Sequence, residues 1–274
     1  SYSGSSDKTQ YYVSIDHLKK EGLLTTNDLN FKQWQATTNF SVQVTKDLKL
    51  GTNLRFATSR RKEPNNRNPF ALAGAEPWLV ARWPNGLMGT AGNAEGPSAV
   101  PLAAIERDLA GGSDYWKDDY YMQFNFDYDM SWLTKGLKVI GYAAFDRSYS
   151  RQSNLLSPFF SYTYDPVTDE YTENLRQVAL NRGTSLDVAK QSSGLDFYNV
   201  KIDYKKDFGL HHIAAFAAFE QNQTFSHLVA GSRRNLPNSS QPYLWAGEVV
   251  DSRNNEEYFE TARMNYFGSL HYEY

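Results

Sequence analysis

The sequence predicts an all-β protein, an antiparallel up-and-down transmembrane β-barrel segment, from its residue alternation, strand length and connection length. The alternation is clearest from Tyr120 to Met130 (YYMQFNFDYDM), where every second residue is apolar or aromatic and most of the others are polar or acidic. Successive side chains of a strand point to opposite faces, so this strand has one apolar and one polar face. In a soluble sandwich the apolar face packs into a core, whereas in a membrane barrel it faces lipid and the polar face borders a wet lumen.

Eight segments are predicted as strands because each is rich in β-branched or aromatic residues and is bounded by turn residues. In chain order, they are Gln10–Leu18, Phe31–Thr45, Leu48–Arg60, Asp118–Met130, Leu137–Ser150, Leu195–Tyr204, His211–Gln221 and Glu257–Tyr274. The fourth strand is the one described above. The second, third, sixth and eighth share its two-faced pattern, whereas the fifth and seventh are less regular because Ala and Gly occur on both sides.

Strand length favours the membrane barrel over the sandwich. Most of the predicted strands have about 10 residues or more, the length that a tilted strand needs to cross a bilayer, whereas strands of soluble proteins average about 5–6 residues. Tyrosines stand near the strand ends, as an interfacial aromatic girdle requires. They are Tyr120, Tyr128, Tyr149, Tyr204, Tyr258, Tyr272 and Tyr274.

Long and short connections alternate along the chain. Three are tight turns, namely Thr45–Gly51, Ser131–Leu137 and Tyr204–Leu210. The long ones are Lys19–Asn30, Arg61–Lys117, Arg151–Gly194 and Asn222–Glu256. A meander with short turns at one end and long extracellular loops at the other produces this order. Residues 1–274 are therefore predicted to be part of one β-barrel domain.

Composition narrows the function classes. The mean hydropathy is −0.61, and no run approaches the roughly 18 apolar residues of a membrane helix. The net charge of −3 gives no electrostatic case for a nucleic-acid partner. The chain contains no Cys, so it carries no disulfide signal.

The sequence offers no convincing catalytic, metal or cofactor motif. His211 and His212 are neighbours on a strand and so point to opposite faces, which prevents joint chelation. Asp127 and Asp129 share a face, but on a lumen wall they are expected to be solvated or paired with basic residues. The glycine-rich segment from Gly86 to Gly96 lacks the Lys-Ser/Thr of a phosphate-binding loop. We therefore expect no enzyme activity, no cofactor and no metal.

The long loops carry the candidate binding residues, because aromatic faces beside polar groups suit a sugar or peptide ligand. The candidates are Trp78, Arg82, Trp83, Tyr115, Trp116, Phe160 and Tyr162. The alternative interpretation is that these rings pack the loops against one another or against a plug.

Several stretches, taken in order, resemble SusC/RagA-type TonB-dependent outer-membrane transporters. The segment KTQYYVSIDHLKKEGLL is similar to their first barrel strand, with Tyr11, Ser14 and the turn residues Glu21 and Gly22 in place. The stretches NFSVQVTKDLKLGTNLRF and YKKDFGLHHIAAFAAFEQ resemble later hairpins, and LTKGLKVIGYAAFD resembles a later strand. The last, NYFGSLHYEY, looks like a further strand with Ser269 where Arg is usual.

This resemblance implies a role in nutrient import. Such transporters have about 22 strands around a plug, so the chain would be a fragment, the first third of a barrel in the bacterial outer membrane. The cargo would be oligosaccharides or peptides, and a SusD-like surface lipoprotein would cover the extracellular loops. TonB would supply energy through an N-terminal segment that this chain lacks.

Two other interpretations remain open at this point. One is a small complete eight-stranded outer-membrane protein with an adhesive or structural role, since the chain ends on Tyr274. The other is a secreted carbohydrate-binding β-sandwich. A sandwich requires Phe124, Val42 and Ile202 to be buried together beneath a second sheet, whereas a membrane barrel leaves them facing outward.

Overall fold

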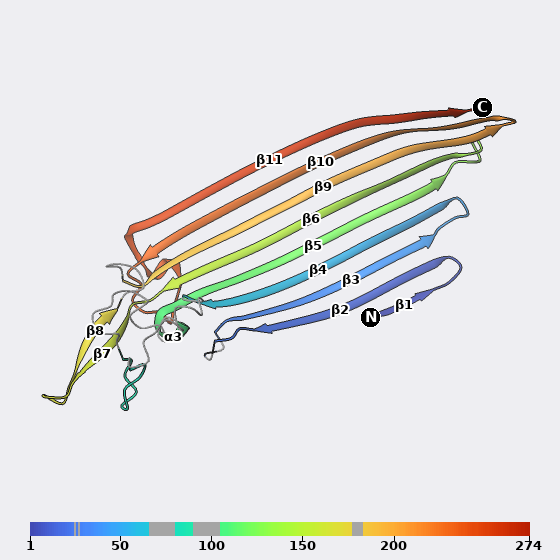
Figure 1. Ribbon diagram of the computed structural model, residues 1–274. Coiled ribbons are helices and arrows are strands. Elements are labelled where there is room, and N and C mark those ends of the chain that lie inside the picture. The colour runs from blue at the N-terminus through green and yellow to red at the C-terminus, as the bar shows by residue number, and fades with distance from the viewer. Residues whose placement is uncertain (25, 27, 66–79, 90–104, 177–182) are drawn as a thin grey trace.

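The computed structural model describes residues 1–24, 26, 28–65, 80–89, 105–176 and 183–274. Nine antiparallel strands form one large sheet in the order β1-β2-β3-β4-β5-β6-β9-β10-β11 (Figure 1). Its strands are β1 (Tyr2–Ser5), β2 (Thr9–Glu21), β3 (Asn30–Gln43), β4 (Leu48–Pro64), β5 (Gly111–Asp129), β6 (Leu137–Leu156), β9 (Ser185–Phe208), β10 (His211–Arg234) and β11 (Glu248–Glu273). Strands β7 (Phe159–Asp165) and β8 (Glu170–Arg176) pair separately as a hairpin.

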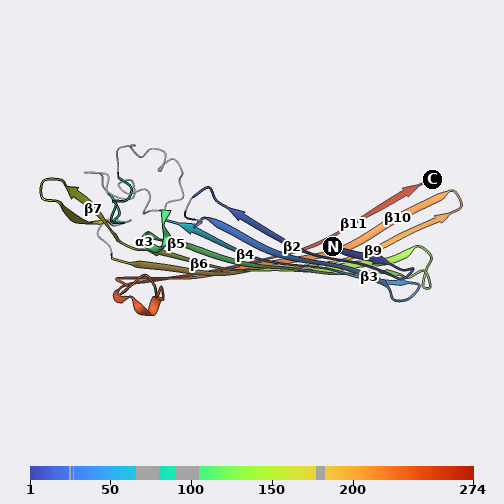
Figure 2. The same cartoon turned by 90° about the horizontal axis from the view of Figure 1, so that it is seen from below.

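The connections confirm the predicted alternation of short turns and long loops. The short turns lie at one end of the sheet, and the β7–β8 hairpin, helix α3 (Arg107–Ala110) and the 3-10 turn η2 (Leu244–Ala246) lie at the other (Figures 1 and 2). The tightest turn joins β9 to β10, where Phe208 pairs with His211. Gly209 adopts a φ of 69° there, the positive value that a two-residue hairpin loop requires.

All eight predicted strands are present, but several are longer than predicted. Strand β9 begins at Ser185 rather than at Leu195, and β10 and β11 also extend further toward the long loops. The added part of β9 contains SSG (192–194), with polar or small residues on both faces. The alternation of polar and apolar residues is lost there, so the sequence pattern does not reveal this part of the strand. The strand continues through it because interstrand hydrogen bonds continue. The short strand β1 and the β7–β8 hairpin were also not predicted.

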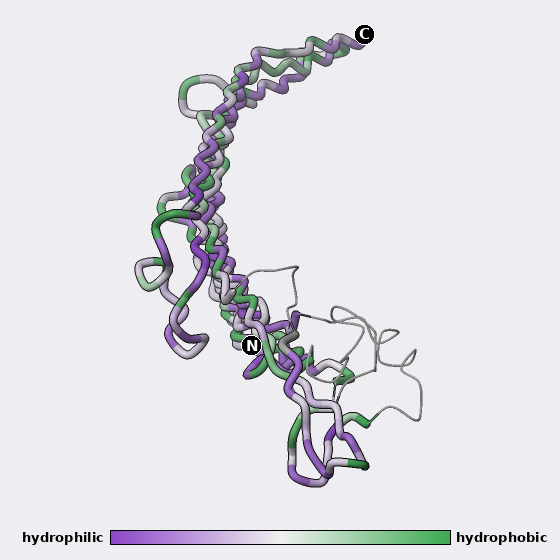
Figure 3. Tube along the Cα trace, turned by 90° about the vertical axis from the view of Figure 1, so that its left-hand side faces the viewer, coloured by the Kyte–Doolittle hydropathy of each residue, from purple (hydrophilic) through white to green (hydrophobic). Residues whose placement is uncertain are grey.

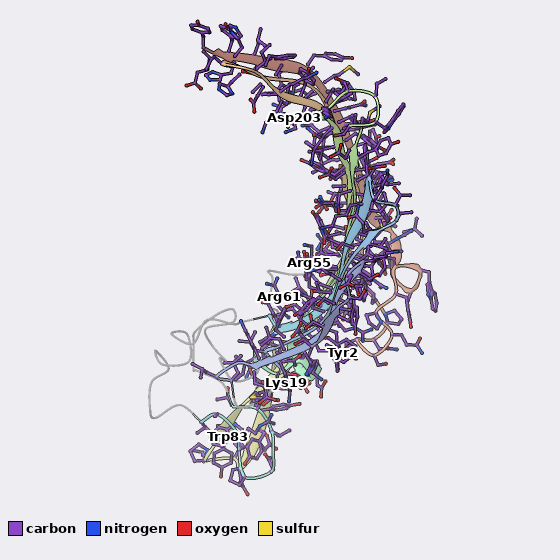
Figure 4. All side chains as sticks on the ribbon, turned by 90° about the vertical axis from the view of Figure 1, so that its right-hand side faces the viewer. Tyr2, Lys19, Arg55, Arg61, Trp83 and Asp203 are labelled. Carbon is purple, nitrogen blue, oxygen red and sulfur yellow. The ribbon has the colours of Figure 1, made fainter. Side chains whose placement is uncertain are left out.

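The large sheet is a single curved layer (Figure 3). Residues that pair across strands share a face, and the register places Leu54, Met122 and Phe145 on one side. In Figure 4, Arg55, Arg61 and Asp203 lie on the concave side, whereas Tyr2 and Lys19 lie on the convex side. The apolar face of the alternating strands is therefore convex, and the polar face is concave.

The apolar face has no second sheet over it within the described residues. Phe124 is 49% exposed and Ile202 is 49% exposed, while Val42 is half-buried. The sandwich interpretation is therefore wrong for this chain. Buried apolar side chains gather instead at the loop end of the sheet, among them Met88, Ile105, Ala110, Phe159, Leu186 and Leu236.

The sheet is open, with β1 at one edge and β11 at the other. These two strands do not pair with each other in the described residues, so the chain does not close into an eight-stranded barrel. None of the described helices is long and apolar enough to span a membrane.

Candidate functional site

The concave wall presents rows of amide and hydroxyl side chains. Register pairing aligns Asn39, Asn53 and Gln123 on neighbouring strands. Tyr142 and Phe197 add an aromatic platform, with ring centroids 5.3 Å apart and planes within 13°. Such a surface can hydrogen-bond a polar ligand and stack against its flat groups.

A shallow hollow with charges of both signs lies on the same wall, nearer the loop end. It is lined in part by Arg55, Lys117, Asp119, Tyr121 and Asp146. The Lys117 ammonium contacts the Asp119 carboxylate at 2.9 Å. Because both signs are present, the hollow is suited to a zwitterionic or strongly hydrogen-bonding partner rather than to a purely anionic one.

The long loops form an aromatic cluster that we call the loop cluster, consisting of Trp83, Tyr162, Tyr164 and Tyr171. The Trp83 indole N–H donates to the Tyr162 carbonyl at 2.9 Å. The Trp83 ring lies 5.6 Å from Tyr164 and 5.7 Å from Tyr171, centroid to centroid. The Tyr162 amide N–H also donates to the Met88 carbonyl at 2.8 Å. One loop is thereby fastened to the β7–β8 hairpin.

Acidic residues of the hairpin hold two of these phenols. The Tyr162 hydroxyl donates to Glu173 at 2.8 Å, and the Tyr164 hydroxyl donates to Asp169 at 2.8 Å. These hydrogen bonds raise the pKa of both tyrosines above the ordinary value of 10.0, because ionisation would remove the donated proton and place two negative charges together.

Two arginines anchor the segment before β5. Arg82 forms an ion pair with Glu106, in which one guanidinium nitrogen lies 2.6 Å from each of the two carboxylate oxygens. The Arg107 guanidinium donates to the Glu63 carbonyl at 2.6 Å, the Ser113 carbonyl at 2.7 Å and the Asp114 carboxylate at 2.6 Å. Arg107 thus ties the outer ends of β4 and β5 to the loop that joins them.

The predicted binding residues do not form a single site. Trp83 and Tyr162 meet in the loop cluster, and Phe160 lies on the same hairpin and is 48% exposed. Arg82 is occupied by Glu106. Trp78 lies outside the described residues.

Tyr115 and Trp116 are adjacent in sequence but face opposite sides of the sheet. Tyr115 lies under the Arg61 guanidinium, 5.3 Å from it, on the concave side. Trp116 shares the convex face, where Arg151 lies 5.4 Å from its ring centroid. Trp116 therefore points away from the concave wall, on which Tyr115 lies.

Sequence reasoning missed Tyr171 and Arg107. Tyr171 could have been found from the DPVTDE turn between two Tyr-containing segments, because a hairpin there pairs Tyr164 with Tyr171. Arg107 had no local signal, since its partners lie on two separate strands.

The adjacent histidines bind different neighbours, as their opposite faces predict. His211 Nδ1 lies 2.6 Å from the Tyr272 hydroxyl, and His212 Nδ1 lies 2.7 Å from Asp207. Within the described ranges, no three His, Cys, Asp or Glu side chains are grouped as metal ligands.

Solved structures provide the comparison that identifies the fold. Structures of the RagAB peptide importer in its closed-closed and open-open states contain a chain that matches this one with TM-scores of 0.70 and 0.71. The match covers 99% of this chain at 17% sequence identity. This chain has the fold of a section of that importer's barrel wall.

The matched section is a part of the larger molecule. This chain spans 29% of the length of the RagAB chain that it matches. No protein-family model and no curated protein sequence matches it. The resemblance to SusC/RagA-type barrels predicted from the sequence is therefore confirmed at the level of fold.

Proposed function

We propose that this chain forms part of the barrel wall of a TonB-dependent outer-membrane importer for oligosaccharides or peptides. The polarity of the curved sheet is the observation that carries this proposal. Apolar side chains such as Phe124 and Ile202 are exposed on the convex face, where lipid solvates them, and amide side chains such as Asn53 line the concave face. A wall built in this way encloses a wet lumen within a membrane.

The chain contributes surfaces for cargo rather than reacting groups. The amide rows, the Tyr142–Phe197 platform and the mixed-charge hollow offer hydrogen bonds and stacking to a polar oligomer. Peptides and oligosaccharides both satisfy this description. The RagAB structures are those of a peptide importer, which makes peptides the first cargo class to test.

A SusD-like lipoprotein would dock on the loop end of the wall, and TonB would act through a segment outside this sequence. The β7–β8 hairpin supports this placement because it projects beyond the sheet (Figure 2) and presents Phe160 to solvent. The loop cluster links that hairpin to a neighbouring loop through the hydrogen bond from Trp83 to Tyr162.

Uptake measurements test the proposal directly. The complete transporter and its lipoprotein are expressed in a host that lacks both, and import of a labelled peptide mixture and a labelled oligosaccharide mixture is followed with and without a protonophore. We expect one cargo class to enter and the protonophore to abolish its entry. Uptake of neither class, or uptake that persists without a proton gradient, would contradict the proposal.

Docking of the lipoprotein has a separate test. Phe160→Ser removes the exposed ring, and we expect less lipoprotein to copurify with the transporter. Thr163→Ser, an exposed change on the same strand, is the matched control and should leave copurification unchanged. Equal copurification in both variants would place the partner elsewhere.

A further inference from the structure

A row of basic side chains crosses the convex face of the sheet. The register pairs Lys19 with Lys32, Lys32 with Arg60, and Arg60 with Trp116. It continues from Trp116 to Arg151, and from Arg151 to Lys190. We call Lys19, Lys32, Arg60, Arg151 and Lys190 the convex basic row. All five side chains are exposed.

An aromatic belt lies next to this row on the side of the short turns. The His17 and Trp34 rings are 4.2 Å apart, and Tyr120 lies 5.0 Å from Phe56 and 6.1 Å from Tyr149, centroid to centroid. Aromatic residues of this kind occupy the level at which hydrocarbon gives way to lipid headgroups. The basic side chains therefore begin where headgroup phosphates are expected.

The row is costly without a counterion. Like charges directly opposite one another on neighbouring strands destabilise a sheet, and both Lys19–Lys32–Arg60 and Arg151–Lys190 are such arrangements. A bound anion would remove this repulsion.

The protein itself neutralises little of this charge. Glu21 pairs with Lys19 and lies near Lys32. Asp118 lines one hollow with Arg151 and Lys190 but forms no ion pair with either. Arg60, Arg151 and Lys190 form no ion pair with another described residue. Arg151 instead lies over the Trp116 ring, which attracts a cation without neutralising it.

We propose that the convex basic row binds the phosphate groups of an anionic lipid in the membrane leaflet nearest the long loops. This inference rests on the membrane placement in the proposed function. Strands of a barrel tilt from the membrane normal, so a register row lies oblique to the membrane plane. Lys32 and Arg60 meet the first phosphates beside the belt. Arg151 and Lys190 stand at the other end of this oblique row and therefore at a different depth, so the row suits a headgroup with phosphates at more than one depth.

Lipid retention by the complete, purified transporter tests this inference. The probes are lipid A carrying both phosphates and the same lipid with its phosphates removed, each titrated into detergent-solubilised protein and followed by native mass spectrometry. We expect the double variant Lys32→Gln/Arg60→Gln to bind phosphorylated lipid A roughly 30-fold more weakly, from the loss of two surface cations. The dephosphorylated lipid should bind weakly to every variant.

A matched control removes the same charge from the opposite face. Lys20 and Arg61 are the neighbours of Lys19 and Arg60 in sequence but face the concave side. Lys20→Gln/Arg61→Gln should bind the lipid with an affinity within about 2-fold of wild type. The charge-preserving variant Lys32→Arg/Arg60→Lys should bind like wild type, because phosphate recognition requires charge on the convex side. A heat-modifiability gel establishes that each variant is an assembled barrel.

Three outcomes overturn the inference. The first is equal binding by the outward and inward double variants, and the second is equal binding of phosphorylated and dephosphorylated lipid. The third is an unchanged lipid affinity together with loss of the lipoprotein from the Lys32→Gln/Arg60→Gln variant, which would make the row a protein contact. Because lipid binding is measured in detergent, it can fail while uptake succeeds, and the reverse.

Discussion

Phe124→Arg is the sharpest test of the polarity of this wall. Phe124 lies midway between Tyr120 and Tyr128 on the convex face of β5, and the residue is 49% exposed. Each tyrosine is ~13 Å away along the strand, which for a strand tilted by ~40° is ~10 Å along the membrane normal. Phe124 therefore lies near the middle of an apolar band ~25 Å tall.

The depth fixes the expected cost. An arginine facing lipid at the midplane destabilises a barrel by about 2–4 kcal/mol, and near the interface by about 0–1 kcal/mol. Phe124→Arg should thus lower the unfolding free energy by about 3 kcal/mol, which changes the unfolding equilibrium constant roughly 100-fold. Tyr120→Arg, at the edge of the same band, should cost about 1 kcal/mol or less.

Urea titration of the complete barrel, refolded into phosphatidylcholine vesicles and followed by tryptophan fluorescence, measures these differences. Gln123→Arg is the control for facing, because residue 123 is adjacent in sequence but pairs with Asn53 on the concave wall. Gln123→Arg should unfold at a urea concentration close to that of wild type. If Gln123→Arg is as destabilising as Phe124→Arg, the assignment of the two faces is wrong.

Three further predictions concern the loop end and the turns. Arg107→Ala should lower stability by about 3 kcal/mol, because a largely buried guanidinium that donates to three acceptors is lost. Arg107→Lys should recover only part of this stability. Limited proteolysis of the loop between β4 and β5 reports the effect, and equal cleavage of wild type and both variants would refute the prediction. Tyr162 and Tyr164 should ionise at a higher pH than ordinary phenols in an absorbance titration, because their hydrogen bonds raise both pKa values; the stabilisation by these bonds is therefore present below pH 10 and lost as pH rises through the folded pKa. Glu173→Gln should bring the ionisation of Tyr162 back toward pH 10. An unchanged Tyr162 ionisation in that variant would contradict the assignment. Gly209→Val should slow barrel assembly and lower stability by about 1–2 kcal/mol, since the φ of 69° at position 209 is unfavourable for a β-branched residue. A folding rate equal to that of wild type would exclude strain at this turn.

The alternating part of the strands could be predicted from the sequence, whereas the parts nearer the long loops could not. The alternation from Tyr120 to Tyr128 marks both faces of β5, because successive side chains of a strand point to opposite faces and here alternate between apolar or aromatic and mostly polar residues. Ser192, Ser193 and Gly194 of β9 are small or polar on both faces of the strand, so they carry no such contrast. The start of β9 at Ser185 is decided by pairing with β6 and β10.

The sequence by itself determined the alternating parts of eight strands, their two polarities and the order of turns and loops. It also selected Trp83 and Tyr162 as aromatic loop residues, but it could not show that they fasten two loops together. Only the tertiary structure decided that the polar face is concave, that Tyr115 and Trp116 point to opposite sides, and that Lys19, Lys32 and Arg60 stand in one row. The physical reason is that curvature and register arise from hydrogen bonds between strands far apart in the chain, whereas a period-two pattern records only which environment each side chain meets.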